Sequence, residues 1–222
     1  MIVFSELASH GPLHACMAWD PEADISIFRE LASMNGVWLV PGSMFIRRDG
    51  KIYNQAVVID PSGAIVGRCD NLFPFVPTEV RTADSRDFLV FDIPFVGRCG
   101  ISICHDVWFP EIARTLSNLG VEVLLRPALT GTTDRPGEMA VVQSTAEVLR
   151  CYVFNVNGLD AGGVGQSLVV DPTGRIVHQG GQNPEIFCIN VDFSLVRQTR
   201  AGAQPSRPSV QTISVPFDRP RR

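Results

Sequence analysis

The sequence contains a single lysine, Lys51, among its 222 residues, and its other basic residues are arginines scattered along the chain. The exception is Arg219-Pro220-Arg221-Arg222, which we interpret as a solvated terminus. With a formal net charge of −4, the chain lacks the basic stripe that nucleic-acid-binding proteins carry. We therefore expect no nucleic-acid partner.

Long apolar runs are also missing. No stretch of 18 consecutive apolar residues could cross a membrane, and no basic leader precedes an apolar block. We expect a cytoplasmic protein without a membrane partner. With 45% hydrophobic residues, the chain can bury one substantial core. We expect a single domain over residues 1–200, followed by a C-terminal arm over 201–222.

Cofactor motifs are absent as well. None of the cysteines forms a C-x-x-C pair or lies in a histidine-rich cluster, which argues against zinc and favours reduced thiols. The glycine-rich segment 162–165 leads into the apolar strand pattern of 167–170, whereas a phosphate-binding loop opens a helix. We expect neither a metal nor a cofactor. The six cysteines are Cys16, Cys69, Cys99, Cys104, Cys151 and Cys188.

The most informative segment is 100–111, which has the pattern of a buried strand, a sharp turn and a helix. The apolar run ends at Cys104, and Pro110 stands where the first turn of a helix tolerates proline. A thiol beside a helix N terminus meets backbone N–H groups that favour the thiolate. Cys104 is therefore a candidate nucleophile, and the alternative is a buried structural cysteine.

Strand and helix patterns alternate along the rest of the chain, as in a layered α/β fold. A helix near 20–36 should bury Ile27, Phe28, Leu31 and Met34. A second helix is expected at 136–150. Two Asp-Pro-x-Gly turns, at 60–63 and 171–174, predict a pair of similar hairpins. The expected strands span 37–46, 52–60, 87–92, 98–104, 121–126, 152–157, 166–171 and 185–191.

The segment around Cys104 resembles the nitrilase (carbon–nitrogen hydrolase) superfamily, most closely its aliphatic amidase and formamidase-like branch. Segments 2–8, 38–44, 53–60 and 155–158 are also similar to that family and occur in the same order. The resemblance runs from about Ile2 to about Arg200. It implies a four-layer αββα sandwich, a small amide or related acyl substrate, and hydrolysis through a thioester on the cysteine.

The resemblance also implies roles for individual residues. Cys104 would be the nucleophile, Glu6 the general base, and Glu79 the second catalytic glutamate. Trp108 and Thr130 are the expected substrate-binding residues.

One position departs from the family. Its catalytic lysine corresponds here to Asn71, which can donate a neutral hydrogen bond but brings no charge. In this family the lysine and a backbone N–H, here that of His105, stabilise the oxyanion. Lys51 lies in the segment Arg47-Arg48-Asp49-Gly50-Lys51, where Asp-Gly predicts a solvated hairpin tip, so it does not replace the missing lysine.

The beginning of the chain departs too, because a strand and a helix precede the glutamate-bearing strand in the family. Either the protein has lost this unit, or the true start lies upstream and this form is truncated. In both cases we expect an N-terminally shortened sandwich that forms a homodimer or a higher homo-oligomer. Three functions fit these observations. The first is an amidase acting on a small linear amide, the second is an acyl-transfer enzyme with an altered site, and the third is a catalytically inactive binding or structural relative.

Overall fold

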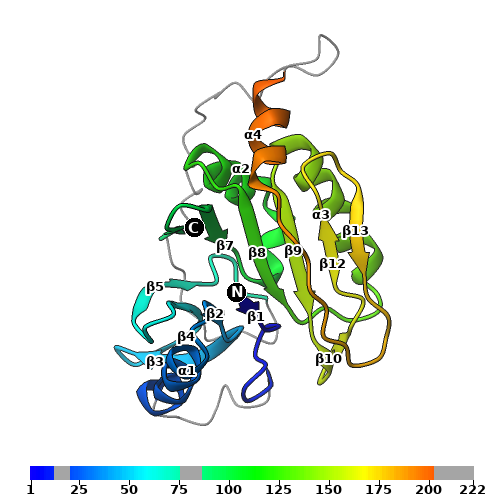
Figure 1. The fold of residues 1–222 in the computed structure, drawn as a ribbon. Helices are drawn as coiled ribbons and strands as arrows, with labels where there is room; N and C mark the ends of the chain where they lie inside the picture. The colour runs from blue at the N-terminus through cyan, green and yellow to red at the C-terminus, as the bar shows by residue number, and fades with distance from the viewer. Residues whose placement is uncertain (13–20, 76–86, 203–222) are drawn as a thin grey trace.

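The computed structural model describes residues 1–12, 21–75 and 87–202 (Figure 1). Alternating helices and strands confirm the α/β class expected from the sequence. The helices are α1 (Pro21–Asn35), α2 (Pro110–Asn118), α3 (Arg135–Leu149) and α4 (Phe193–Ala201), with the 3₁₀ helix η2 (Cys104–Trp108). The strands are β1 (Ile2–Val3), β2 (Leu39–Val40), β3 (Ser43–Arg48), β4 (Lys51–Ile59), β5 (Ile65–Asp70), β6 (Leu89–Ile93), β7 (Gly97–Ile101), β8 (Val123–Ala128), β9 (Tyr152–Asn157), β10 (Leu159–Asp160), β11 (Gly163–Val164), β12 (Leu168–Val170) and β13 (Ile176–Gln179).

The strands form two main sheets. The first has the order β1-β2-β4-β3, with β5 also paired to β4, and the second has the order β13-β12-β9-β8-β7-β6. Within the second sheet β7, β8 and β9 run parallel, so their carboxyl ends meet at one edge. Strands β10 and β11 form a small separate hairpin.

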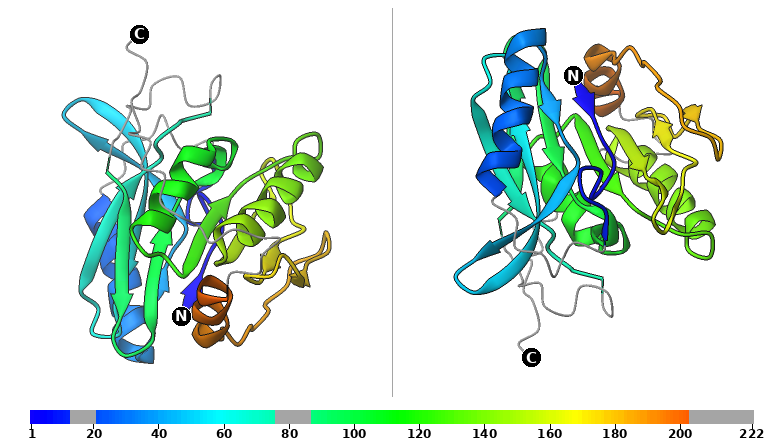
Figure 2. Two further views of the ribbon diagram at one scale, coloured as in Figure 1. Left: turned by 90° about the horizontal axis from the view of Figure 1, so that it is seen from above. Right: turned by 90° about the horizontal axis from the view of Figure 1, so that it is seen from below.

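Three hydrophobic clusters lie between successive layers of the molecule. The first joins α1 to the first sheet, the second joins the two sheets, and the third joins the second sheet to α2 and α3. Side chains alternate along each strand, so Leu124 faces the helices while its neighbour Leu125 faces the other sheet. Both views in Figure 2 place α1 and α3 on opposite sides of the molecule.

The buried face of α1 differs from the expected one. The structure buries Ile25 and Ala32 against the first sheet and half-buries Phe28. The expected core residues Ile27, Leu31 and Met34 are 58%, 46% and 75% exposed. The helix carries apolar side chains on two faces, and the positions i, i+3 and i+7 beginning at Ile25 are the ones that meet the sheet.

Several strand boundaries also differ from the expectation. The strand expected at 37–46 is divided into β2 and β3 at Pro41-Gly42, and β7 ends at Ile101, before Cys104. No strand forms over 185–191, and the second sheet instead ends in β13.

The two predicted Asp-Pro-x-Gly hairpins are confirmed as β4–β5 and β12–β13. Asp60 Oδ1 accepts the backbone N–H of Ser62 at 2.8 Å, and Asp171 Oδ1 accepts that of Thr173 at 2.8 Å. The same side-chain turn chemistry therefore closes one hairpin in each sheet.

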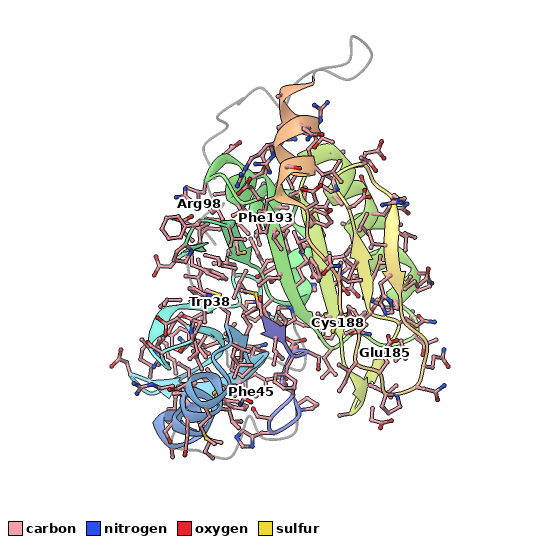
Figure 3. All side chains as sticks on the ribbon, viewed as in Figure 1. Trp38, Phe45, Arg98, Glu185, Cys188 and Phe193 are labelled. Atoms are coloured by element: carbon pink, nitrogen blue, oxygen red, sulfur yellow. The ribbon has the colours of Figure 1, made fainter. Side chains whose placement is uncertain are left out.

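Helix α4 packs on the second sheet near the inter-sheet cluster. Phe193, at its first position, lies against Gly97 of β7, beside Arg98 (Figure 3). The Arg200 guanidinium donates to the carbonyl of Val121 at 2.7 Å and to that of Arg150 at 3.1 Å. Residues of the expected arm from 203 onward lie outside the described part of the chain.

Gly42 determines how the first sheet meets the segment that carries Glu6. Its φ is +77°, and a Cβ at this position would collide with the carbonyl oxygen of Ser5. Only glycine combines this backbone conformation with so close an approach.

We predict that Gly42→Ala destabilises the protein more than Gly50→Ala does. Gly50 has a similar φ of +74°, but a Cβ added there would meet no heavy atom within 4 Å, so it controls for backbone strain alone. That strain costs about 1–2 kcal/mol, and the collision at Gly42 should add about 1–3 kcal/mol. Urea unfolding of both variants measures the difference, and equal losses would contradict the prediction.

Candidate active site

Cys104 stands at a strained bend after β7. Ile103 is still extended, with φ −111° and ψ 126°, whereas Cys104 has φ +38° and begins η2. A residue other than glycine rarely adopts positive φ, and such strain gathers at functional sites. The bend projects the thiol at the carboxyl edge of the parallel strands. The nearby Thr130 follows β8.

The carboxylate of Asp106 stabilises this bend. Its Oδ2 accepts the backbone N–H of Ile103 at 3.0 Å. Its Oδ1 accepts the N–H groups of Leu72 at 3.1 Å and Phe73 at 3.0 Å. One buried side chain therefore joins the nucleophile bend to the segment that follows Asn71.

Burial also changes the acidity of Asp106. It raises the pKa of Asp106 to about 7, although the three N–H donors and the charge of Arg126 act in the opposite direction.

Glu6 is held between the two sheets and is 6% exposed. Its backbone N–H donates to the carbonyl of Ala128 in the second sheet at 3.3 Å. The next residue, Leu7, has φ +51° and donates its N–H to Ser43 Oγ of the first sheet at 3.3 Å. Asn54 Nδ2 donates to Glu6 Oε1 at 2.7 Å. These contacts fix the carboxylate beside Cys104.

Burial raises the pKa of the Cys104 thiol well above its ordinary value, and the charge of Glu6 and a hydrogen bond between the two side chains raise it further. The expectation that a helix N terminus would favour the thiolate is therefore wrong for this site. The element after the cysteine is a short 3₁₀ helix, and burial together with Glu6 outweighs its backbone N–H groups. Cys104 is therefore held as a thiol with the carboxylate of Glu6 beside it.

A cavity of about 150 Å³ opens over this pair. The described residues that line it are Glu6, Leu7, Pro12, Phe45, Phe75, Cys104, His105, Val107, Trp108, Leu129, Thr130, Gly131 and Asp134. A larger cavity of about 350 Å³ between α2 and α3 contains neither Cys104 nor Glu6. The smaller cavity is therefore the candidate active site.

Thr130 is positioned for contact with the thiol. Its Oγ1 lies 3.9 Å from Cys104 Sγ. Both of its backbone groups bind the side chain of Asn157, with Thr130 N–H donating to Oδ1 at 2.7 Å and Asn157 Nδ2 donating to the Thr130 carbonyl at 3.0 Å. This double contact fixes the part of the cavity wall that Thr130 forms.

The ring of His105 is engaged away from the thiol. His105 Nδ1 lies 2.9 Å from the carbonyl oxygen of Phe73, and the ring meets Phe75 and Phe109 edge-on. The side chain thus ties the bend to the 71–75 segment.

Asn71 is 1% exposed and does not belong to the described lining of the cavity. Its backbone N–H donates to the carbonyl of Asn54 at 2.7 Å, and its Oδ1 accepts the N–H of Phe73 at 3.1 Å. Its Nδ2 has no hydrogen-bond partner among the described residues. A buried unpaired donor costs about 1–3 kcal/mol, so the conformation of this amide calls for an explanation.

Three further residues singled out in the sequence are Lys51, Glu79 and Cys16. Lys51 is exposed at the β3–β4 turn and does not line the cavity. Glu79 lies in segment 76–86, outside the described residues, as does Cys16 in 13–20.

Sequence reasoning missed a buried charged network behind the bend. Arg126 is 1% exposed, and its Nε donates to Ser102 Oγ at 2.9 Å. Arg135 donates to Glu138 at 2.7 Å and to Asn155 at 2.5 Å. The position of Arg126 inside the apolar run of β8 could have indicated this network, because a buried charge needs a partner.

Among residues 1–12, 21–75 and 87–202, no group of three or more histidine, cysteine, aspartate or glutamate side chains is placed to hold a metal ion. None of the helices in these ranges has the length and hydropathy that a bilayer crossing requires.

Comparison with known proteins identifies the family. The carbon–nitrogen hydrolase family matches residues 1–201. The chain belongs to this family. A formamidase from Bacillus cereus (strain B4264) is 32% identical over 216 residues, which is 91% of this chain and 64% of the formamidase. The chain thus spans less than two thirds of the length of this relative.

Solved structures show the same fold. Nit3 of Saccharomyces cerevisiae, a member of branch 10 of the nitrilase superfamily, superposes with a TM-score of 0.81 at 22% identity, covering 90% of this chain and 79% of Nit3. An amidase from Nesterenkonia sp. AN1, with the acetamide moiety of fluoroacetamide added at its active-site cysteine, gives a TM-score of 0.78 at 20% identity, covering 89% and 79%.

We predict that Glu6→Gln lowers the pKa of the Cys104 thiol, because the substitution removes the negative charge that disfavours the thiolate. Alkylation by iodoacetamide as a function of pH, with peptide mapping of Cys104, measures the midpoint. Glu30→Gln, a change of the same charge on the exposed face of α1, should leave the midpoint unchanged. An unchanged or higher midpoint in Glu6→Gln would contradict the assigned pairing.

A second prediction concerns Asp106→Asn, which keeps one acceptor oxygen but places an amide N–H against the N–H of Ile103. The loss of stability should be about 1–3 kcal/mol. Because the pKa of Asp106 is about 7 when folded and near 4 when unfolded, the folded state binds the extra proton between these values. The stability of the wild type relative to Asp106→Asn therefore falls as pH rises from about 4 to about 7.

Urea unfolding of both proteins at several pH values measures this trend. A stability advantage that instead grows with pH would mean that the N–H donors and Arg126 outweigh burial.

Proposed function

We propose that this protein is an amidase that hydrolyses a small linear amide through a thioester on Cys104. The observation that carries the proposal is the buried carboxylate of Glu6 beside a thiol at a strained bend, inside a cavity. The Bacillus cereus formamidase supports it as a sequence relative, and the Nesterenkonia amidase, also described in complex with butyramide, as a structural one.

The arrangement suits acyl transfer in two steps. Glu6 takes the proton of Cys104 as the sulfur attacks the amide carbon, so the thiolate forms only when substrate is present. The C–N bond then breaks, the leaving nitrogen takes the proton from Glu6, and ammonia or an amine departs. Water attacks the thioester with Glu6 again as base, releasing the carboxylic acid and the free thiol.

The oxyanion would be stabilised without a lysine. In this proposal the backbone N–H of His105 and the side-chain amide of Asn71 are the donors, and the unpaired Nδ2 of Asn71 supports that role. One donor of this kind is worth about 2.7–4 kcal/mol. A neutral amide stabilises the developing charge less than an ammonium does, so we expect slower turnover than with lysine. Glu79 is proposed as the second glutamate of the site.

The size of the cavity limits the substrate. At about 150 Å³ it is smaller than the roughly 300–1,000 Å³ of pockets for drug-sized ligands. A short acyl chain fits this volume, with Trp108 and Thr130 as its contacts.

The rest of the proposal concerns the assembly. We propose that the layers form a four-layer αββα sandwich of the nitrilase type. The apolar cavity between α2 and α3, which includes Val148 at 54% exposure, offers a surface that a second copy could cover in a homodimer. The free cysteines among the described residues suit a cytoplasmic protein.

A catalytically inactive relative is the second candidate, and the uncharged Asn71 is the observation that favours it. An acyl-transfer enzyme is the third, in which an acceptor other than water would take the acyl group.

Intact-mass detection of an acyl adduct on Cys104 after exposure to small amides and esters tests the proposal. An adduct that maps to Cys104 and decays with release of the acid supports the amidase. A stable adduct that only an added amine or thiol removes favours acyl transfer, and no adduct with any compound favours the inactive relative.

We predict that Asn71→Lys raises kcat for small amides on the order of 10²-fold, because a cationic donor returns to the developing oxyanion. The effect should appear in kcat more than in KM, since the charge exists mainly in the transition state. Asn71→Met, which lengthens the side chain without adding charge, is the matched control. Steady-state kinetics of the two variants, each with and without Cys104→Ala, measure the effect. A fall in native activity on Asn71→Lys would show that Asn71 itself is the working residue.

A further inference from the structure

The charges on the cavity wall bear on the identity of the substrate. Among the described lining residues, the formally charged side chains are Glu6 and Asp134, and neither a lysine nor an arginine is present. Glu6 is buried beside the thiol, whereas Asp134 is exposed. A small cavity with carboxylates in its wall concentrates a field of one sign and attracts cations.

The carboxylate of Asp134 is available for a ligand. Asp134 occupies the N-cap position of α3, but its side chain makes no capping hydrogen bond there. The hydrogen bond that Asp134 makes here uses its backbone, since its carbonyl accepts the N–H of Glu138 at 3.0 Å. The side chain thus forms neither an ion pair nor a hydrogen bond within the described part of the chain.

An aromatic ring lies close to the same helix turn. Trp108 lines the cavity, and its ring packs on the first turn of α3, where a Cβ on Gly137 would come within 3.1 Å of Cη2. Gly137 is three residues after Asp134. A carboxylate and an indole ring that line the same cavity are a combination that binds an ammonium group, through ion pairing and a cation–π contact.

Within the described part of the chain, the two buried arginines closest to this wall do not reverse the field. The buried Arg135 is paired with Glu138 at 2.7 Å, and the buried Arg126 interacts with Asp106 and Glu138. The N terminus of α3 contributes about half a positive charge, which the full charge of Asp134 exceeds.

We propose that the substrate is an ω-amino amide, whose protonated amine binds between Asp134 and Trp108 while its amide carbonyl lies at Cys104. This inference rests on the proposed amidase function and adds the charge of the substrate to it. Cleavage follows the same two steps, and the ammonium group takes no part in bond breaking.

Three amides of similar size separate charge from shape. In 4-aminobutanamide an ammonium replaces the terminal methyl of pentanamide, and succinamate carries a carboxylate instead. Calorimetric binding to the Cys104→Ala variant gives an affinity for each compound that does not depend on turnover. We expect 4-aminobutanamide to bind at least tenfold more tightly than pentanamide, succinamate to bind most weakly, and the preference for the cation to shrink at high salt.

Asp134→Asn, made in the same Cys104→Ala background, should lower the ratio of the affinities for 4-aminobutanamide and pentanamide at least fivefold. Asp49→Asn is the matched control, because it removes the same charge from the exposed β3–β4 turn and should keep the ratio.

Equal or better binding of pentanamide or succinamate, a ratio that survives Asp134→Asn, or no binding of any of the three would overturn the inference. Turnover by the wild type separates this failure from that of the proposed function. Hydrolysis of pentanamide without a preference for the cation leaves the amidase intact, whereas selective binding of 4-aminobutanamide without any Cys104 adduct rejects the amidase and keeps the cation site.

Discussion

The carboxylate of Asp106 is the constraint on which the geometry of the site depends. It accepts backbone N–H groups from Ile103, Leu72 and Phe73, which belong to two segments far apart in the sequence. The same carboxylate therefore holds both the strained backbone at Cys104 and the segment that follows Asn71. A single buried acceptor can do this because each backbone donor that it satisfies would otherwise be costly to bury.

Charge around the thiol is arranged in two zones. Behind the bend, Arg126 and Arg135 lie near Asp106 and Glu138, so the formal charges of this buried group cancel. In front of the bend, the described cavity wall carries the carboxylates of Glu6 and Asp134. Burial of the Cys104 thiol, together with the charge of Glu6, raises its pKa and favours the protonated form.

Local sequence patterns predicted the turns and helix starts, because these depend on residues close together in the chain. The turn at Cys104, the start of α2 at Pro110 and the two Asp-Pro-x-Gly hairpins follow from turn chemistry and periodicity. The buried face of α1 could not be predicted in this way, because two apolar stripes compete and only tertiary packing selects Ile25 and Ala32.

The residues of the site were predictable from the sequence, but their burial and contacts were not. The family resemblance named Glu6, Cys104 and Thr130, and the structure brings these residues to one cavity. It also named Asn71, but neither its burial nor its unpaired amide can be read from residue types. The raised pKa of Cys104 was missed because sequence shows the adjacent helix but not the depth of burial.

The carboxylate of Glu6 and the thiol of Cys104 are both positioned by the packing of the two sheets. Cys104 continues from the second sheet, whereas the segment of Glu6 is bound by Ser43 of the first sheet and by Ala128 of the second. The distance between the Glu6 carboxylate and the Cys104 thiol is therefore set by how the two sheets fit together. A methyl group added to or removed from the core between the sheets, far from the cavity, would change this distance and with it the reactivity of the Cys104 thiol.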